Sequence, residues 1–372
     1  MDTLDKLRLL SDASRYDLAC ACGTKDGDHR VRGQDGTWLY PVSLANGGKQ
    51  IMLKTLMSNI CSSDCAYCPY RSTMDVRRCS LLPDEVASIF MDYVRQRKVI
   101  GLFLSSGVVG TPDRTMEMLT ATASILRKKH AYRGHIHLKV IPGSSQAAID
   151  TALSLANAVS INIETPGEKH CAKLSGKKRF IEDIIGSLQY ISRQTGKGMK
   201  HSRVRQSTQF IVGASDETDA EIVTYTSALY RKLGLNRVYF SAYQRGLGRN
   251  DIPGEQRERG TKEEGFLREH RLYQVDFLLR KYGFEKDEIP FDSEGHLIRD
   301  RDPKRVWAES HPERFPIDVN TASVSDLLRV PGIGPETAKR IVLQRKTGRI
   351  NSFDHLPFKG KRQTDARAFL KF

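Results

Sequence analysis

Strand-length apolar runs alternate with helix-like segments through the middle of this 372-residue chain. Such alternation indicates parallel βαβ units, because two parallel neighbouring strands need a long crossover that is usually helical. The runs therefore predict an α/β fold with six parallel strands, a number that fits a partial (β/α)6 barrel. The predicted strands are Ile51–Met57, Val99–Ser105, His135–Ile141, Ala158–Glu164, Ser207–Val212 and Arg237–Ala242.

The helix-like segments between these runs carry the usual start signals. The first begins with LPDEV, which places a proline and acidic residues in its first turn. Active sites of such barrels lie on the loops that follow the strands. We therefore expect functional residues directly after each strand. The predicted helices are Pro83–Arg97, Pro112–His130, Ser144–Leu155, Arg179–Arg193, Asp216–Leu233 and, beyond the barrel strands, Glu263–Tyr282.

The cysteines of the chain point to a metal rather than to disulfides. Their number is odd, and the N-terminal MDTLDKLRLL lacks the basic-then-apolar order of an export signal. No apolar run approaches the roughly 18 residues that span a bilayer. We therefore expect a soluble cytoplasmic protein with no membrane contact. The cysteines are Cys20, Cys22, Cys61, Cys65, Cys68, Cys79 and Cys171.

Cys61, Cys65 and Cys68 lie close together in CSSDCAYC, directly after the first predicted strand. Three thiolates leave a four-coordinate centre one ligand short. In a zinc site water would fill that position, and in a 4Fe–4S cluster one iron would stay open for a cofactor or substrate. A structural zinc knuckle is an alternative, with Cys79 as the candidate fourth ligand on that side.

CSSDCAYC resembles the CxxxCx(aromatic)C loop of the radical S-adenosylmethionine (SAM) superfamily, with Tyr67 as the aromatic residue. The resemblance implies that Cys61, Cys65 and Cys68 hold a 4Fe–4S cluster that binds SAM. One-electron reduction would then cleave SAM to methionine and a 5′-deoxyadenosyl radical. The following YCPYR also fits the resemblance, with Arg71 as an anchor of the cluster loop.

The same resemblance implies SAM contacts at several strand ends. LSSGVVG takes the place of the glycine-rich GGE stretch of the superfamily, but it lacks the glutamate. In SINIETP, strand alternation predicts that Asn162 and Glu164 point into the barrel. An ordinary turn and a strand-end hydrogen bond are the simpler explanations of these two stretches. Tyr243 and Arg245 are expected near the barrel mouth. The predicted cofactor contacts are Tyr67, Ser105, Ser106, Gly107, Asn162, Glu164 and Gly213.

The C-terminal sequence contains PGIG between two helical patterns, at Ser325–Val330 and Glu336–Lys346. A glycine-flanked turn that enters a helix offers free N–H groups to a phosphate. This stretch resembles the helix–hairpin–helix module of DNA repair and DNA uptake proteins. A second hairpin at LPFKGK is degraded, and Thr364–Leu370 would be the helix after it. The resemblance implies DNA contacts at Gly332, Ile333, Gly334, Lys339, Arg340 and Gly360.

Basic residues agree with a polyanionic partner. The net charge is +15, and residues 301–372 hold 15 lysines and arginines against 8 acidic residues. Phosphate contacts of this kind position a duplex without reading its sequence. Lys169–Arg205 is a second basic stretch, and its first part, KHCAKLSGKKR, is expected at the active-site mouth. A hairpin that binds protein is the alternative reading of the C-terminal module.

The combination resembles the family of DNA modification and repair radical SAM proteins, which is linked to a uracil-DNA-glycosylase-like partner. It implies duplex DNA as substrate and a one-electron donor such as flavodoxin or ferredoxin. The alternatives are an RNA-modifying radical SAM enzyme, and a non-enzymatic DNA-binding protein with a structural or redox-sensing cluster. The predicted parts are an irregular cap (1–50), the barrel (51–285), a linker (286–316) and a small all-α helix–hairpin–helix domain (317–372).

Overall fold

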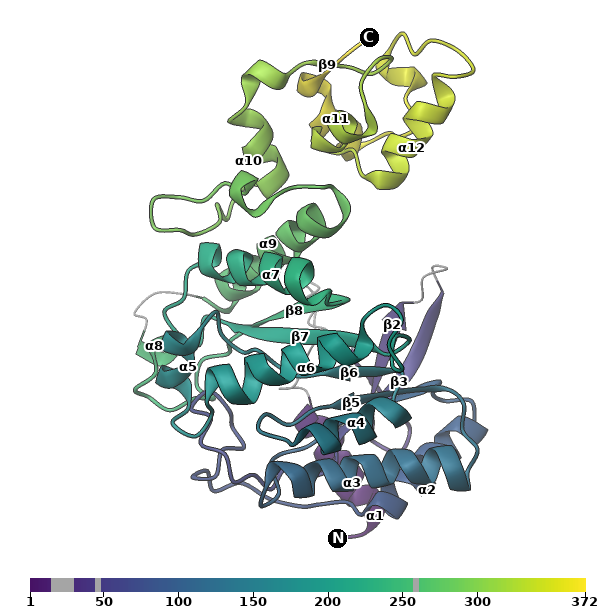
Figure 1. Cartoon of the computed structure of the whole chain (residues 1–372). Coiled ribbons are helices and arrows are strands. Elements are labelled where there is room, and N and C mark those ends of the chain that lie inside the picture. The colour runs from purple at the N-terminus through teal and green to yellow at the C-terminus, as the bar shows by residue number, and fades with distance from the viewer. Residues whose placement is uncertain (15–29, 44–47, 257–260) are drawn as a thin grey trace. The chain divides into compact units, whose positions relative to one another are not determined.

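The computed structural model describes residues 1–14, 30–43, 48–256 and 261–372 (Figure 1). Cys20 and Cys22 lie outside the described residues. The chain divides into two compact units, described separately below. The first unit comprises Met1–Glu217 and Leu229–Phe266, and the second comprises Thr218–Ala228 and Leu267–Phe372.

A single sheet of eight strands, in chain order, organises the first unit. Strands β3 to β8 are all parallel. This arrangement confirms the predicted α/β fold with a partial parallel barrel. The six parallel strands are β3 (Lys49–Leu56), β4 (Gly101–Ser105), β5 (His135–Lys139), β6 (Ala158–Ser160), β7 (Arg205–Val212) and β8 (Arg237–Ala242).

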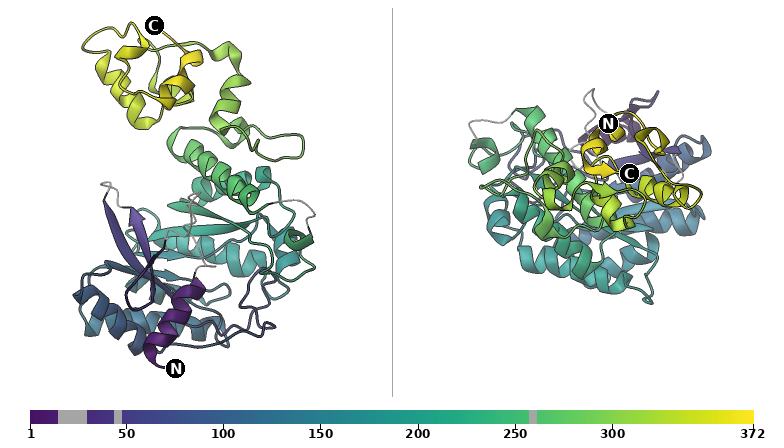
Figure 2. Two further views of the ribbon diagram at one scale, coloured as in Figure 1. Left: turned by 180° about the vertical axis from the view of Figure 1, so that it is seen from behind. Right: turned by 90° about the horizontal axis from the view of Figure 1, so that it is seen from above.

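Helices cover one face of this sheet, as Figures 1 and 2 show. The face beneath them is apolar, because alternate strand residues such as Leu53, Leu102 and Ile136 are fully buried. Short π-helical turns extend α3 at its end and precede α6. The helices of the first unit after β3 are α2 (Pro83–Arg95), α3 (Pro112–Ser124), α4 (Gln146–Leu155), α5 (Glu168–Leu174), α6 (Gly186–Thr195) and α8 (Pro253–Gln256).

The N-terminal region has more regular structure than the predicted irregular cap. Its described part contains helix α1 (Thr3–Ala13), whose N-cap Asp2 accepts a hydrogen bond from the backbone N–H of Asp5. Strands β1 (Val31–Arg32) and β2 (Trp38–Ser43) form an antiparallel ribbon that pairs with β3. The cap therefore extends the sheet at one edge.

The predicted strand Ala158–Glu164 is wrong in its second half, since β6 ends at Ser160. The hydroxyl of Thr208 explains the early end. It donates to the carbonyl of Ile161 (2.7 Å) and accepts from the N–H of Ile163 (2.9 Å), so a side chain replaces the backbone ladder. Glu164 then adopts a left-handed conformation with φ +64°.

The second unit is helical apart from one short parallel pair, β9 (Ile317–Asp318) with β10 (Leu370–Lys371), which departs from the expected all-α domain. Its core contains Trp307, Phe284 and Leu327. The expected linker 286–316 includes a helix, and the predicted domain bounds stay a prediction. The helices that contribute to the unit are α7 (Asp219–Leu233), α9 (Lys262–Lys281), α10 (Pro303–Glu309), α11 (Val324–Arg329), α12 (Pro335–Gln344) and α13 (Lys361–Ala366).

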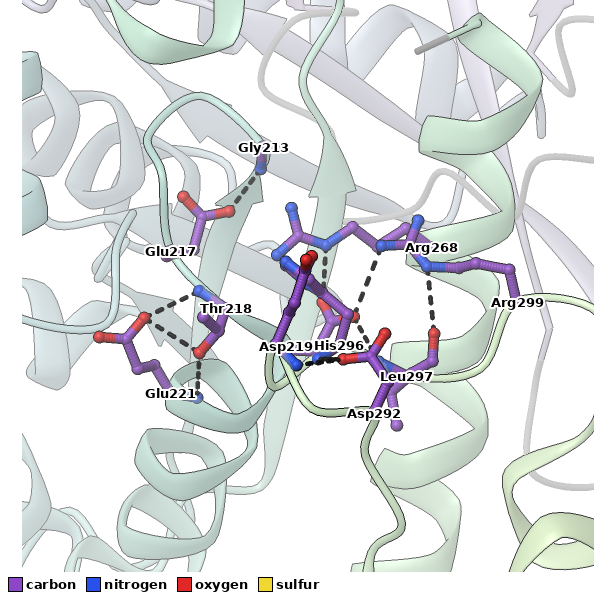
Figure 3. A network of polar contacts seen from close by, with 11 residues as sticks. Gly213, Glu217, Thr218, Asp219, Glu221, Arg268, Asp292, His296, Leu297 and Arg299 are labelled. Carbon is purple, nitrogen blue, oxygen red and sulfur yellow. Dashed lines mark hydrogen bonds and ion pairs between the residues drawn. The ribbon is translucent and has the colours of Figure 1, made fainter. Parts of the chain in front are cut away.

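A buried carboxylate joins three segments of the second unit (Figure 3). Asp219 is fully buried and accepts from Arg268 Nε (2.6 Å) and from the N–H of Leu297 (2.9 Å). His296 lies 3.5 Å from the same carboxylate and Arg299 lies 3.7 Å from it. Burial opposes ionisation, but His296 and Arg268 hold the pKa of Asp219 well below its usual range.

Candidate metal centre and nucleic-acid hairpin

The three clustered cysteines lie on the loop that follows β3 in the first unit. Cys65 is buried, and Cys61 and Cys68 are partly buried. The N–H of Met57 donates to the carbonyl of Ser105 (2.7 Å), so the pairing of β3 with β4 continues to the start of this loop. The cysteines therefore lie at the carboxyl edge of the parallel strands, where barrel active sites are found.

Loops from three other strand ends fix the cysteine loop in place. The N–H of Ser62 donates to the carbonyl of Val108 in the loop after β4 (2.9 Å). The N–H of Ala66 donates to Leu174 at the end of α5 (2.7 Å), and the carbonyl of Ala66 accepts from Arg249 beyond β8 (2.7 Å). The loop thus takes its shape from distant parts of the chain.

Gly107 allows the loop after β4 to approach the cysteine loop closely. A Cβ atom at Gly107 would lie 2.5 Å from the carbonyl oxygen of Ile60 and 3.1 Å from the Cβ of Cys61. The next residue, Val108, donates its N–H to the Sγ of Cys61 (3.4 Å). Gly107 was predicted to contact a cofactor, and the structure gives it this packing role.

Polar side chains that the sequence did not single out also hold the cysteine loop. The carboxylate of Asp64 accepts from Ser175 Oγ (2.5 Å) and from the N–H of Gly176 (2.9 Å). The Arg78 guanidinium donates to several carbonyls of the loop, among them that of Tyr70 (2.8 Å). Arg71 donates to the carbonyls of Cys68 and Leu247, both at 3.0 Å, as expected of an anchor.

A group of buried and partly buried polar side chains lies beside Cys65. Lys178 Nζ donates to Tyr67 Oη (3.1 Å) and lies 3.8 Å from the Glu164 carboxylate. The Asn162 amide donates to the same carboxylate (3.5 Å). The structure therefore brings together Tyr67, Asn162 and Glu164, which were predicted to contact a cofactor. It adds Lys178, which the sequence showed only as one lysine in a basic stretch.

Ionisation in this group is strongly perturbed. Burial, and then the neighbouring Cys65 and Glu164, raise the pKa of Tyr67. Burial lowers the pKa of Lys178, but Cys65 and Glu164 outweigh it and leave that pKa raised overall. Such shifts gather at functional sites, although structural ion pairs cause them too. Glu164 also has a left-handed backbone conformation, which is a sign of local strain at the same place.

The remaining predicted contacts are less concentrated. Ser105 is buried at the end of β4, and the hydroxyl of Ser106 is buried without a hydrogen-bond partner among the described residues. Gly213 has φ +92° and donates its N–H to Glu217 (2.6 Å). Tyr243 and Arg245 are both bound to Glu255, through its side chain and its carbonyl respectively. Tyr243 also packs against the buried apolar cluster that contains Ala66 of the cysteine loop.

The residues present fit a cluster held by three thiolates. Backbone N–H groups of Ser63 and Tyr70 donate to the Sγ atoms of Cys61 and Cys68, both at 3.4 Å. Burial and the neighbouring Cys65 raise the pKa of Cys68 to about 12, and a coordinated metal ion would deprotonate such a thiol. Within the described ranges, no three His, Cys, Asp or Glu side chains are placed to hold a single metal ion.

The unpartnered Ser106 hydroxyl leaves a polar atom for a bound cofactor.

In the second unit, PGIG forms the expected turn between α11 and α12. Gly332 has φ +80°, and a Cβ atom there would overlap the carbonyl oxygen of Arg362. Ile333 is buried, and Gly334 is the N-cap of α12. Gly360 has φ +68° and is the N-cap of α13. The degraded second hairpin therefore packs its first helical turn against the first hairpin.

Lys304 also holds this turn in place, a role that the sequence analysis did not predict. Its buried Nζ donates to the carbonyl of Ile333 (2.5 Å) and lies 4.6 Å from the ring centroid of Tyr282. Burial lowers the pKa of Lys304 to about 7. Of the predicted basic contacts, Lys339 is exposed and pairs with Glu336 (3.2 Å), while Arg340 bonds to the carbonyl of Pro357.

Two protein-family models match the chain. Residues 55–229 match the Radical SAM superfamily, and residues 314–357 match the helix–hairpin–helix motif. The chain therefore contains a radical SAM domain, the domain of a class of enzymes that use a 4Fe–4S cluster and SAM. The predicted enzyme class and both cofactors are confirmed at the level of this domain.

Solved structures resemble the chain only weakly. Methylornithine synthase (PylB) has 14% identity and a TM-score of 0.46, and covers 60% of this chain and 62% of its own. The FeFe-hydrogenase maturase HydG from Carboxydothermus hydrogenoformans has 15% identity and a TM-score of 0.48, with 61% of this chain and 51% of its own covered. The chain thus spans about three fifths or less of these two proteins, and neither identifies its reaction.

No curated protein matches the chain. Among the helices of the described residues, none is both long and apolar enough to cross a membrane.

Proposed function

We propose that this chain is a radical SAM enzyme that modifies or repairs DNA. The observation that carries the proposal is the presence of a radical SAM domain and a helix–hairpin–helix motif in one chain. The first supplies a radical reaction, and the second is typical of proteins that hold nucleic acid by its phosphates.

Cys61, Cys65 and Cys68 are the proposed cluster ligands. When bound, the reduced cluster and SAM supply a 5′-deoxyadenosyl radical that abstracts a hydrogen atom. The group formed by Tyr67, Asn162, Glu164 and Lys178 is the proposed cradle for the polar groups of SAM, together with Ser106. Its support is that Asn162 and Glu164 are buried and that the partly buried Lys178 and Tyr67 interact with Cys65.

Apolar side chains around this group would keep water from the reaction. Ala66, Leu174, Ala214 and Ile252 form a buried cluster, and Tyr67 packs against it. Excluding water protects a reactive species from side reactions and strengthens the electrostatic interactions inside the site.

The hairpin at Gly332–Gly334 is the proposed DNA contact, with Lys339 on the following helix. The helix N-terminus after Gly334 offers backbone N–H groups and the positive end of its dipole to a phosphate. Such contacts carry no sequence information, so the proposed substrate is a duplex of any sequence. Gly360 contributes to the proposed DNA site by shaping the backbone of the second hairpin.

The proposal includes three further elements. The reaction needs a one-electron donor, for which flavodoxin or ferredoxin is the proposed class. A uracil-DNA-glycosylase-like protein is a proposed partner in repair. The proposed location is the cytoplasm, because the described cysteines are all free thiols, as expected in a reducing compartment.

Anaerobic turnover tests the enzymatic proposal. The reconstituted, reduced full chain is incubated with SAM and with damaged or undamaged duplex DNA, and 5′-deoxyadenosine and the nucleosides are measured by mass spectrometry. We expect 5′-deoxyadenosine and an altered nucleoside. The triple change of Cys61, Cys65 and Cys68 to Ala should abolish both products and the iron content.

Cys79→Ser is the matched control, because Cys79 is a buried thiol of the same unit whose Sγ contacts the carbonyl of Lys6 at 3.9 Å. It should retain iron and turnover. A wild type that makes no 5′-deoxyadenosine would refute the enzymatic claim. Turnover that alters transfer RNA but never DNA would replace the substrate by RNA.

Salt-dependent binding tests the hairpin separately. Lys339→Ala should weaken binding to duplexes of unrelated sequence equally and lower the log–log salt slope by about 0.9. An unchanged salt slope would show that Lys339 does not contact a phosphate.

A further inference from the structure

The inner face of the sheet, opposite the helices, is basic and aromatic. Its members follow from strand register, because directly paired residues point to the same side. Met52 pairs with Gly101, and Gly101 pairs with His135. A Cβ atom at Gly101 would lie 3.1 Å from the His135 Cβ and 3.2 Å from Met52 Cε, which agrees with one shared face.

One row of this inner face holds two rings in tilted contact, with an interplanar angle of 55°, beside a lysine. Lys54 pairs with Phe103, which pairs with His137. The rings of Phe103 and His137 have centroids 4.2 Å apart, and Lys54 Nζ lies 5.0 Å from the Phe103 centroid. Phe103 and His137 are only partly buried, so part of each side chain is exposed to solvent. His137 Nε2 is hydrogen-bonded to Ser160 Oγ at 2.9 Å.

The next row, nearer the cysteine loop, holds two hydroxyls between two cations, with a third hydroxyl, that of Ser105, beyond the lysine. Register places Ser105, Lys139, Ser160, Ser207 and Arg237 side by side across five strands. Ser105 and Lys139 follow the Phe103–His137 pair by two residues, so this row lies one pleat higher on the same face. Serine hydroxyls and basic side chains are the groups that proteins use to hold phosphate oxygens.

Charge on this face has one sign. The inner-face positions of β3 to β8, all of them described, hold Lys54, Lys139, Arg205, Arg237, His135 and His137, and no aspartate or glutamate. Burial, and then Arg205 and Arg127, lower the pKa of His135. Like charges so close together raise the electrostatic energy of the empty site and attract an anion.

We infer that the inner face binds one nucleotide of single-stranded or unpaired DNA, with its base stacked on Phe103 beside His137 and its phosphates on Lys139 and Arg237. The inference rests on the proposed function and names the substrate unit of the same site. Enzymes that react with a base commonly draw it out of the duplex, and aromatic rings stack on bases of any identity.

The test uses the full chain and a fluorescent five-nucleotide DNA, measured by anisotropy at several salt concentrations. Lys139→Met with Arg237→Met should weaken binding about tenfold or more and lower the salt slope by about 1.4, or 0.7 for each lost phosphate contact. Phe103→Leu should weaken binding about fivefold or more, within the range for one lost base–aromatic stack, and leave the slope unchanged.

The control is Lys197→Met with Lys200→Met, which removes the same charge from an exposed turn of the first unit. It should change binding less than twofold. Circular dichroism and the melting temperature establish that each variant is folded. A 5-bromodeoxyuridine pentamer should cross-link under ultraviolet light to peptides of residues 101–105 or 135–139, whatever the affinity of the variants.

Equal loss in the inner-face and control variants, or cross-links outside these strands, would overturn the inference. Tighter binding of the matching RNA pentamer would overturn the DNA assignment. The outcomes are separate from turnover. If the wild type alters DNA but the inner-face variants still bind the pentamer normally, only this inference is refuted. If the wild type binds the pentamer through the inner face but makes no 5′-deoxyadenosine, the proposed function is refuted instead.

Discussion

The cysteine loop and the PGIG hairpin solve the same packing problem in different ways. In each, a glycine lets two backbone segments approach more closely than a Cβ would allow, Gly107 in the first and Gly332 in the second. The cysteine loop bonds to Leu247, 176 positions from Arg71. The hairpin bonds to Lys304, 29 positions from Ile333. The first therefore needs the whole sheet, and the second needs only its own unit.

The largest expected effect concerns the second unit. Asp219→Asn leaves Arg268 buried without its full counter-charge, and loss of one partner of a buried ion pair costs about 3–5 kcal/mol. The free energy of unfolding of this unit, measured with urea, should fall by about that amount. Glu309→Gln, at an exposed pair with Arg305, should cost less than about 1 kcal/mol.

Hydrogen exchange localises this loss. We expect faster exchange in residues 267–372 and little change in β3 to β6. Equal loosening of both units would show that they are not independently stable and would break the comparison above.

Gly107→Ala tests the cysteine loop. The added methyl group meets the Ile60 carbonyl, and over-packing of this kind costs about 1–3 kcal/mol. We expect less iron per chain after reconstitution, because Cys61 would be displaced, and unchanged duplex binding. Gly348→Ala is the control, since a Cβ atom at Gly348 meets nothing within 4 Å.

Gly332→Ala should have the reverse effects on iron content and on duplex binding. The variant requires a left-handed alanine and a displaced Arg362 carbonyl, so the hairpin should distort. Duplex binding should fall at least tenfold while iron content stays normal. Loss of iron in this variant would show that the two sites do not fold independently.

A separate expected effect is the pH dependence of the hairpin support. The folded pKa of Lys304 is lowered to about 7 from a usual value near 10.5. Between these two values the unfolded chain binds the additional proton, so the stability of the second unit should rise with pH from about 7 to about 10. The destabilisation is present in full below pH 7.

Lys304→Met should flatten this rise in a series of melting temperatures measured from pH 6 to pH 10. A slope that persists in the variant would assign it to another group.

The sequence predicted the features that depend on local pattern. Alternating strands and helices gave the six parallel strands in order, and the spacing of Cys61, Cys65 and Cys68 located the loop after β3. PGIG predicted a turn that enters a helix. Each of these signals lies within a short window, where periodicity or a motif specifies the backbone.

The features that the sequence missed depend on partners far away in the chain. Lys178 reads as one of ten basic residues between Lys169 and Arg205, and only tertiary contact places it beside Tyr67. Asp64 depends on Ser175 in the same way. The strand predicted through Glu164 ended early because a hydroxyl on the neighbouring strand, Thr208, took over its hydrogen bonds. No local rule reports such competition.

The N-terminal ribbon has a consequence for how the sheet meets other molecules. Without it, β3 would present a long row of unpaired N–H and C=O groups, which is a template for pairing with another chain. Strand β2 occupies that row, and the outermost strand β1 is only two residues long, one of them Arg32. A chain begun at residue 48 would expose the β3 edge, so this shortened chain should self-associate at concentrations where the full chain does not.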